Sequence, residues 1–208
     1  MAAAFVPAGL ARDDADRAYR AGTGLLNRGM NDAAAAEYRA FLNDHADHPK
    51  ADHARYGLAV CLVRMGKCNE AVQELDRVVT KRDFEFAPDA KLLRGRCSFA
   101  ADDFRTAIVW FERTIREHPG YPQLDSATAQ LGESHYRIGN AAKPREALET
   151  LVTRWPQSPS RERGDYLLAL CDVWRCSIGL NPRRTKSSGR GRSRGRRSLR
   201  LDKENVDA

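Results

Sequence analysis

Apolar positions recur along the chain at helical spacing. In the stretch LGESHYRIGN, Leu131, Tyr136 and Ile138 stand among polar residues at the intervals that one face of an α-helix presents. Ala and Leu are abundant, Val and Ile are few, and the alternating apolar–polar pattern of strands is missing. The pattern therefore predicts an all-α fold.

Two glycines interrupt this helical stretch. Gly132 lies inside it, where glycine costs about 1 kcal/mol relative to alanine, and Gly139 follows near its end. A glycine inside a helix is explained if a second helix passes so close that a side chain would hold the two apart. A glycine just past a helix end can adopt a left-handed conformation and satisfy the last carbonyls. We expect Gly132 to lie at a helix–helix contact and Gly139 to end the helix.

The same arrangement recurs along the chain. In each repeat an alanine opens the second of two amphipathic helices, and a large apolar residue follows it four positions later. These pairs are Ala34/Tyr38, Ala71/Leu75, Ala107/Phe111 and Ala147/Leu151, and successive alanines are 37, 36 and 40 residues apart. The last offset implies a three-residue insertion at 141–144. The first helices carry a small residue at matching places, namely Gly22, Ala59, Gly95, Gly132 and Ala169. Matching turns hold Gly29, Gly66, Asp102 and Gly139, and Pro49, Pro88, Pro119 and Pro156 mark the repeat ends.

This pattern resembles the tetratricopeptide repeat, W-x2-L-G-x2-Y, then A-x3-F, then P, with Leu131-Gly132 and Tyr136 as the best match and the leading Trp replaced by Thr128. The resemblance covers most of the chain and implies a right-handed superhelical solenoid of antiparallel helix pairs. We expect about four and a half repeats over residues 12–176. The alternative is an ordinary helical bundle with scattered glycines, which the recurrence in phase disfavours.

The linkers between repeats indicate a narrower group of related proteins within this family. His-Pro and Trp-Pro linkers such as Trp155-Pro156 are similar to those of bacterial TolA-binding proteins and outer-membrane assembly lipoproteins. Residues 1–11 are apolar, and Gly9-Leu10-Ala11 would suit a signal-peptidase site, although no basic region precedes it. We expect a periplasmic or envelope location on this basis. A cytosolic protein with a disordered leader is the alternative, and no apolar run is long enough for a membrane span.

The charge is concentrated at one end. The chain has a formal net charge of +7, residues 183–208 hold 10 Lys/Arg against 3 Asp/Glu, and the remainder holds 25 of each. Residues 177–208 are rich in Arg, Gly and Ser, so we expect a disordered tail in place of the second helix of the fifth repeat. Three interpretations stay open: a segment that binds nucleic acid or another anionic partner, an inert tail, and a reading-frame artefact.

Reactive side chains do not form a recognisable catalytic or metal site. Cys61, Cys97 and Cys171 each follow the small position by two residues, which indicates buried packing. The histidines of DHADHPKADH lie in a predicted linker, where solvated polar residues are expected rather than metal ligands. Neither GTGLLNRG nor SGRGRSRG has the spacing and flanking elements of a nucleotide-binding loop. We therefore predict no enzyme activity, no cofactor and no bound metal.

The remaining candidate surface is the groove lined by the first helices. Stacked repeats curve and present a concave surface to ligands, and Tyr and Arg are enriched at binding hot spots. The phase of the helices points nine such residues inward: Tyr19, Tyr56, Arg64, Arg96, Phe99, Tyr136, Arg137, Tyr166 and Trp174. Some of them, Phe99 and Tyr136 above all, could instead pack between repeats. The sequence thus predicts a scaffold that binds a protein or peptide in this groove, or else a cytosolic adaptor whose tail binds nucleic acid.

Overall fold

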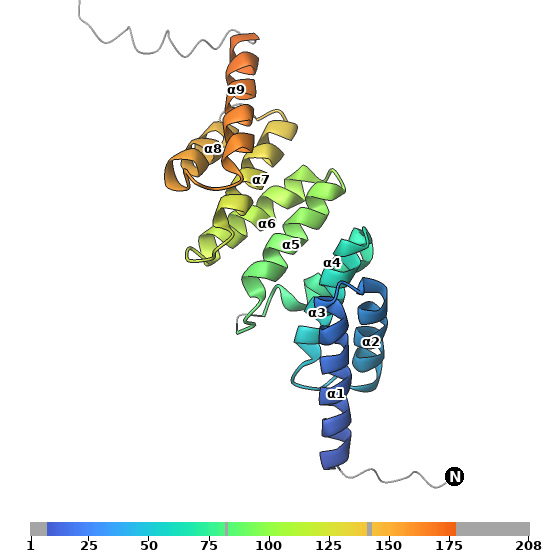
Figure 1. Cartoon of the computed structure of the whole chain (residues 1–208). Coiled ribbons are helices and arrows are strands. Elements are labelled where there is room, and N and C mark those ends of the chain that lie inside the picture. The colour runs from blue at the N-terminus through green and yellow to red at the C-terminus, as the bar shows by residue number, and fades with distance from the viewer. Residues whose placement is uncertain (1–7, 82, 141–142, 178–208) are drawn as a thin grey trace, which may run out of the picture.

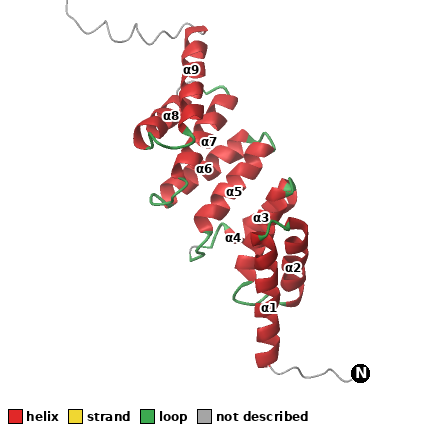
Figure 2. Cartoon of the chain, in the orientation of Figure 1, coloured by secondary structure: helices red, strands yellow, loops and turns green. Residues whose placement is uncertain are grey.

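The chain folds into a row of antiparallel helix pairs. The computed structural model describes residues 8–81, 83–140 and 143–177, with side chains placed from 14 to 173. All regular secondary structure in these ranges is helical (Figures 1 and 2). The helices are α1 (Ala8–Asn27), α2 (Asn31–Asp44), α3 (Ala51–Arg64), α4 (Cys68–Val78), α5 (Ala87–Ala100), α6 (Phe104–Glu117), α7 (Leu124–Arg137), α8 (Lys143–Arg154) and α9 (Arg161–Ser177).

Each helix packs mainly on its neighbours in the sequence, and the first helices of adjacent repeats also touch, as in α1 with α3 and α7 with α9. The result is the elongated solenoid visible in Figure 1, which confirms the predicted all-α fold. Helix α1 begins inside the predicted leader of residues 1–11, and the predicted tail lies, apart from Ser177, outside the described residues.

Small residues let the two helices of a repeat approach closely. A Cβ atom added to Gly132 would lie 2.6 Å from Cδ2 of Leu148 in α8, and one added to Gly95 would lie 2.6 Å from Cε1 of Phe111 in α6. Gly22 meets the ring of Tyr38 at 3.0 Å in the same way. Leu148 and Phe111 are fully buried, so neither has free space into which it could retreat. The predicted role of Gly132 is confirmed.

The same contacts correct the alignment of the fourth repeat. Leu148, and not Leu151, faces Gly132, so it is the counterpart of Phe111. Pro144 then takes the place of the small residue that opens the second helix, and it is buried there. The repeat keeps a period close to 37 residues, and the insertion predicted at 141–144 is wrong. A proline is suited to this place because the first turn of a helix needs no backbone donor from it.

The turns within the repeats follow the prediction. Gly29, Gly66 and Gly139 have φ of 75°, 75° and 72°, and Asp102, the residue that replaces glycine in the third repeat, has φ of 57°. Asp102 tolerates this left-handed conformation better than most residues with a side chain do. Pro88 departs from the prediction: it lies in the first turn of α5 and therefore begins a helix instead of ending a repeat.

The three equivalent cysteines behave as small apolar residues. Cys61, Cys97 and Cys171 are all buried, which confirms the packing role. Burial, with a further contribution from nearby Cys68, raises the pKa of Cys97 to about 12, so its thiol stays protonated and unreactive at neutral pH.

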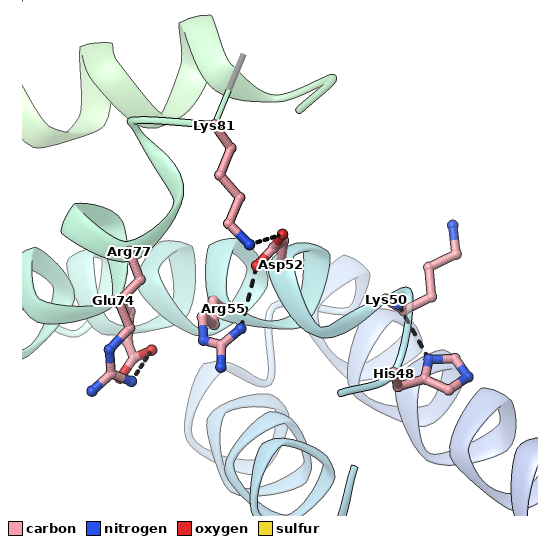
Figure 3. A network of polar contacts seen from close by, with 7 residues as sticks. All are labelled: His48, Lys50, Asp52, Arg55, Glu74, Arg77 and Lys81. Carbon is pink, nitrogen blue, oxygen red and sulfur yellow. Dashed lines mark hydrogen bonds and ion pairs between the residues drawn. The ribbon is translucent and has the colours of Figure 1, made fainter. Parts of the chain in front are cut away.

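A polar contact that recurs with the repeat holds three of the linkers against the first helix of the same repeat. In each, a linker residue bonds to a residue about 32 positions earlier, in the first turn of that helix: Glu85 with His53 (2.7 Å), Tyr121 with Asp89 (2.7 Å) and Ser158 with Asp125 (2.5 Å). In the first repeat His48 has the equivalent place, but it lies 3.9 Å from Asp16 in the middle of α1, beyond hydrogen-bond distance. Lys81 adds a similar bond by donating to Asp52 of α3 at 2.5 Å, beside the bond from Arg55 to the same carboxylate (Figure 3).

The histidines of the first linker are partly buried against aromatic rings, whereas the sequence predicts solvated side chains. His45 and His48 place their rings 5.6 and 5.5 Å from that of Phe41. His53 lies within α3 and contacts Phe84 and Phe86 at 5.4 and 5.7 Å. Imidazole rings can pack on aromatic side chains while one nitrogen keeps a polar partner, so these residues build the junctions between repeats.

One ion-pair cluster within the third repeat gives a testable pH dependence. Lys91 is buried and donates to Glu117 at 2.6 Å, and Arg113 donates to the same carboxylate at 2.8 Å. These bonds, the one from Lys91 above all, lower the pKa of Glu117 to about 2 from its ordinary value near 4.5. Because the folded-state pKa is depressed, the stabilisation is complete above about pH 4.5 and is lost as the pH falls toward 2.

Glu117→Gln should therefore lower the melting temperature at pH 6, because it leaves the buried ammonium of Lys91 without its anion. The difference from the parent should shrink between about pH 4.5 and 2. Thermal melts followed by circular dichroism measure both. The exposed pair of Glu70 with Arg39 supplies the control: Glu70→Gln should change little at either pH. A difference for Glu117→Gln that is constant with pH would contradict the assignment.

Candidate protein-binding groove

A pocket between α3 and α5 brings three of the predicted groove residues together. Tyr56, Arg64 and Arg96 line a cavity of about 280 Å³ on the face formed by the first helices, hereafter the first-helix face. Tyr56, Val60 and Arg64 are spaced four residues apart on α3, and Asp89, Leu93 and Arg96 follow at spacings of four and three on α5. Such residues share one side of their helix, and the packing of α3 beside α5 turns both sides toward the same space.

Tyr56 is fixed in this pocket by an aromatic partner. Its ring lies parallel to that of Phe86, with 5.1 Å between centroids and 7° between planes. Burial, followed by the nearby charge of Asp89, raises the pKa of Tyr56 to about 12, although Arg64 and Arg96 act in the opposite direction. The phenol therefore stays protonated at physiological pH and can donate a hydrogen bond.

The two arginines give the pocket an excess of positive charge. Within the described residues neither Arg64 nor Arg96 has an acidic side chain within ion-pair distance. Arg96 donates to the hydroxyl of Ser126 on α7 at 3.0 Å, and the exposed Arg64 makes only a long bond of 3.4 Å to the carbonyl of Leu26. Asp89 is the one acid in the lining, and it accepts a hydrogen bond from Tyr121. Two cations facing one anion favour a ligand that carries a carboxylate.

Sequence reasoning missed the part of this pocket that the linkers supply. Phe86 precedes α5, and Tyr121 and Gln123 precede α7, yet all three contact the pocket or its residues. Burial and the bond to Asp89 raise the pKa of Tyr121, which keeps its hydroxyl a donor. The repeat period held a usable signal: Asp89 occupies the place that Asp16 has two repeats earlier and Asp125 has one repeat later, and a polar linker residue follows each of them at a spacing of 32 or 33 residues. The prediction of solvated linkers hides this contribution.

Three other predicted groove residues pack between helices. Tyr19 contacts the rings of Tyr38 and Phe41 at 6.1 and 6.0 Å in the N-terminal core. Phe99 contacts Phe104 of α6 at 5.2 Å. Tyr136 packs on the cluster of α7, α8 and α9 that contains Leu148 and Leu167. All three rings are half-buried, as is that of Tyr56, but none of the three lines the pocket between α3 and α5.

The last three predicted residues lie at the C-terminal end of the array, away from the pocket. Arg137 donates to Glu133 at 3.3 Å, and Glu133 also receives a two-pronged bond from Arg163 of α9 at 2.6 and 3.3 Å. Tyr166 is 56% exposed on α9, with the guanidinium of Arg163 5.8 Å from its ring. Trp174 is on α9, but its side chain lies outside the described part of the chain. Arg137 is thus a structural ion-pair partner, and Tyr166 is a separate exposed feature.

Other kinds of site find little support in the described residues. They contain no group of three or more His, Cys, Asp or Glu side chains arranged to hold a metal ion. None of their helices combines the length and apolar character that crossing a bilayer requires.

Comparison with known proteins agrees with this architecture. A family model described as tetratricopeptide repeat matches residues 19–64 and 62–122, which together make up half of the chain. No curated protein sequence matches. Among solved structures, MamA residues 41 to the end from Desulfovibrio magneticus RS-1 superposes with a TM-score of 0.61 at 18% identity, covering 85% of this chain and 98% of that one.

Two further structures show the same fold. The TPR-like repeats of a putative kinesin light chain from Podosopora anserina give a TM-score of 0.61 at 16% identity, covering 84% of this chain and 92% of that one. YrrB, described as a TPR protein with an unusual peptide-binding site, gives 0.63 at 20% identity, covering 73% and 74%. With the helix pairs, the close-packing glycines and the family match in agreement, the chain belongs to the tetratricopeptide repeat family of protein-interaction scaffolds.

Proposed function

We propose that this protein is a non-enzymatic scaffold that binds a peptide segment of a partner protein on its first-helix face, centred on the pocket between α3 and α5. The observation that carries the proposal is the convergence of Tyr56, Arg64 and Arg96 from two repeats in one cavity. The solved structure of YrrB, whose description names a peptide-binding site, is a precedent within the same fold. A scaffold of this kind needs no catalytic groups, only fixed donors and apolar walls.

The chemistry of the pocket defines the segment that it would accept. Val60, Val63 and Leu93 provide an apolar wall, and the two arginines stand beside it without acidic partners in the described residues. An apolar side chain next to an aspartate, a glutamate or a chain-terminal carboxylate would satisfy both features. The protonated phenol of Tyr56 adds a donor for a backbone carbonyl or the same carboxylate.

A comparative pull-down tests this function. The full chain, the double variant Tyr56→Ala/Arg96→Ala and the variant Gln73→Ala would each serve as bait, with quantitative mass spectrometry of the bound proteins. Gln73 is exposed on α4, on the opposite side of the array. A partner retained by Gln73→Ala but lost by the double variant supports the proposal. If every bound protein is recovered equally by all three baits, the pocket is not the binding site.

We further propose a location in the bacterial cell envelope. The proposal rests on the His-Pro and Trp-Pro linkers, which are similar to those of envelope proteins with this repeat. Fractionation of cells that express the natural gene, followed by immunodetection, provides the test. Recovery with cytoplasmic markers would contradict the location but would leave the peptide-binding proposal intact.

The second candidate function is binding of nucleic acid or another anionic partner through residues 183–208. Their 10 Lys/Arg against 3 Asp/Glu, beside a remainder of balanced charge, favour it. Such binding depends on phosphate contacts, so the affinity for a random DNA duplex should fall at least about a thousandfold between roughly 50 and 200 mM salt. Fluorescence anisotropy measures this. Deletion of 183–208 should abolish binding and preserve helicity, and binding by the truncated chain would refute this candidate.

A further inference from the structure

A second pocket lies on the opposite face of the array, between α6 and α8, with α7 as its floor. Its volume is about 360 Å³. Ile115, Leu131, Ala147 and Trp155 give it apolar walls, and Glu112 and His135 supply a polar corner. A cavity of this size with mostly apolar walls and a few convergent polar groups has the character of a site for a side chain or small ligand. The proposed function does not use it.

His135 is an unusual residue for its place in the repeat. It follows the close-packing glycine Gly132 by three residues, where the first two repeats have Leu25 and Leu62 and the third has the much smaller Ser98. Its side chain is only 6% exposed, and Nδ1 is buried with no hydrogen-bond partner in the described residues. Burying an imidazole costs more than burying leucine unless its polar atoms are satisfied. Packing alone therefore does not account for a histidine here.

The other ring nitrogen faces a carboxylate across a gap. Nε2 of His135 lies 3.8 Å from Oε1 of Glu112, farther than a hydrogen bond allows. Burial lowers the pKa of His135, and the charge of Lys143 acts in the same direction, whereas Glu112 opposes both. The imidazole is thus neutral at physiological pH. In the tautomer that carries its proton on Nε2, the buried Nδ1 has only a lone pair. Nε2 can then donate a hydrogen bond to a ligand in the pocket.

A hydroxyl group on a ligand would satisfy both polar side chains of this corner. It can accept a hydrogen bond from Nε2 of His135 and donate one to Glu112, which a purely apolar group or a second carboxylate cannot do. The formal charges around the pocket balance, with Glu112 and Glu146 against Lys143 and Arg154, so a neutral ligand fits better than an ion. The apolar walls require that the hydroxyl be attached to a ring or a similar apolar body.

We propose that this pocket receives a tyrosine side chain presented by a partner protein. The phenol ring lies against Trp155 and Leu131, and its hydroxyl bridges His135 and Glu112. The position of the pocket favours a tyrosine that is part of a partner protein over a free small molecule. It opens between two surface helices, and exposed charged residues at its mouth, Lys143, Glu146 and Arg154, are placed to meet the neighbours of the inserted side chain. The site is independent of the pocket between α3 and α5.

Titration of the full chain with N-acetyl-tyrosinamide, followed by NMR, tests the proposal. The expected result is millimolar binding with shifts at the Trp155 indole and along α6 to α8. N-acetyl-phenylalaninamide, which lacks only the hydroxyl, should bind about tenfold more weakly. His135→Leu introduces the residue of the first two repeats and should reduce that ratio to near one. Glu112→Gln, on a side chain that is 45% exposed, should lower the ratio without any risk to folding.

The control is Tyr56→Ala, which alters the other pocket and should leave the titration unchanged. No detectable binding of the tyrosine probe, equal binding of the two probes by the parent protein, or shifts centred on α3 and α5 would each overturn the proposal. So would a tyrosine preference that survives in Glu112→Gln and His135→Leu alike. A failure of the peptide-binding proposal would appear only in the pull-down with the Tyr56→Ala/Arg96→Ala variant, so the two outcomes can be distinguished.

Discussion

Gly132→Leu should lower the melting temperature by about 4 to 10 °C, a loss of roughly 1 to 3 kcal/mol or more. Even a Cβ atom at this position would lie 2.6 Å from Cδ2 and 2.7 Å from Cγ of Leu148. Leu148 is fully buried, so it can yield only if α7 and α8 separate. Thermal and urea melts followed by circular dichroism measure the effect, because the signal reports helix content directly.

A glycine in another helix supplies the matched control. Gly24 lies in the last turn of α1, and a Cβ atom added there would have nothing within 4 Å. Gly24→Ala should raise stability by about 0.5 to 1 kcal/mol, the ordinary advantage of alanine over glycine in a helix. The two substitutions are therefore expected to shift the melting temperature in opposite directions. A Gly132→Leu protein as stable as the parent would show that the repeats do not pack as described.

Truncation of either anchor of the pocket between α3 and α5 should weaken binding of the peptide partner by about 5- to 30-fold, or roughly 1 to 2 kcal/mol. Tyr56→Ala removes a ring that is held by Phe86, and Arg96→Ala removes a cation that Ser126 holds in place. Arg96→Ala lies at the surface of the pocket and should leave the melting temperature nearly unchanged. Tyr56→Ala also removes a ring that packs on Phe86 and on the N-terminal core, so it should lower the melting temperature, and its binding is measured well below that temperature. Isothermal calorimetry with the partner that the pull-down identifies measures the loss.

The control for Tyr56→Ala and Arg96→Ala must change a side chain that is exposed and lies outside the pocket. Glu74 lies on a second helix, but it is only 16% exposed and accepts two bonds from Arg77 (Figure 3), so its removal could disturb α4. Gln73 is exposed on the same helix, and Gln73→Ala should bind the partner as the parent does. Weaker binding by Gln73→Ala than by both pocket variants would place the partner on the second helices.

The periodic features of the fold could be predicted because each depends on local chemistry. Gly132 and Gly139 are required by a close helix contact and a left-handed turn, and both requirements appear directly in the sequence. The alignment of Ala147 with Ala107 is wrong for a related reason: it rests on alanine at the small position, although buried Pro144 fills that position equally well. A register defined by the large residue opposite the glycine would have found Leu148.

The groove was harder to predict because helical phase does not determine which aromatic side chains become buried. Tyr56 and Tyr136 both belong to first helices and are both half-buried, yet Tyr56 lines a pocket while Tyr136 packs against the cluster around Leu167. That difference depends on the neighbouring repeat. The contributions of Phe86 and Tyr121 were missed because they come from linkers, whose contacts with a preceding helix span more than 30 residues.

Site-specific photo-crosslinking tests the central claim, that a partner binds on the first-helix face, most directly. A photoreactive phenylalanine analogue would replace Leu93, a half-buried residue of the pocket lining, and in a second protein Gln73 on α4. Irradiation with the identified partner should give a covalent product from position 93 and none from position 73. A product from position 73 without one from position 93 would contradict the account.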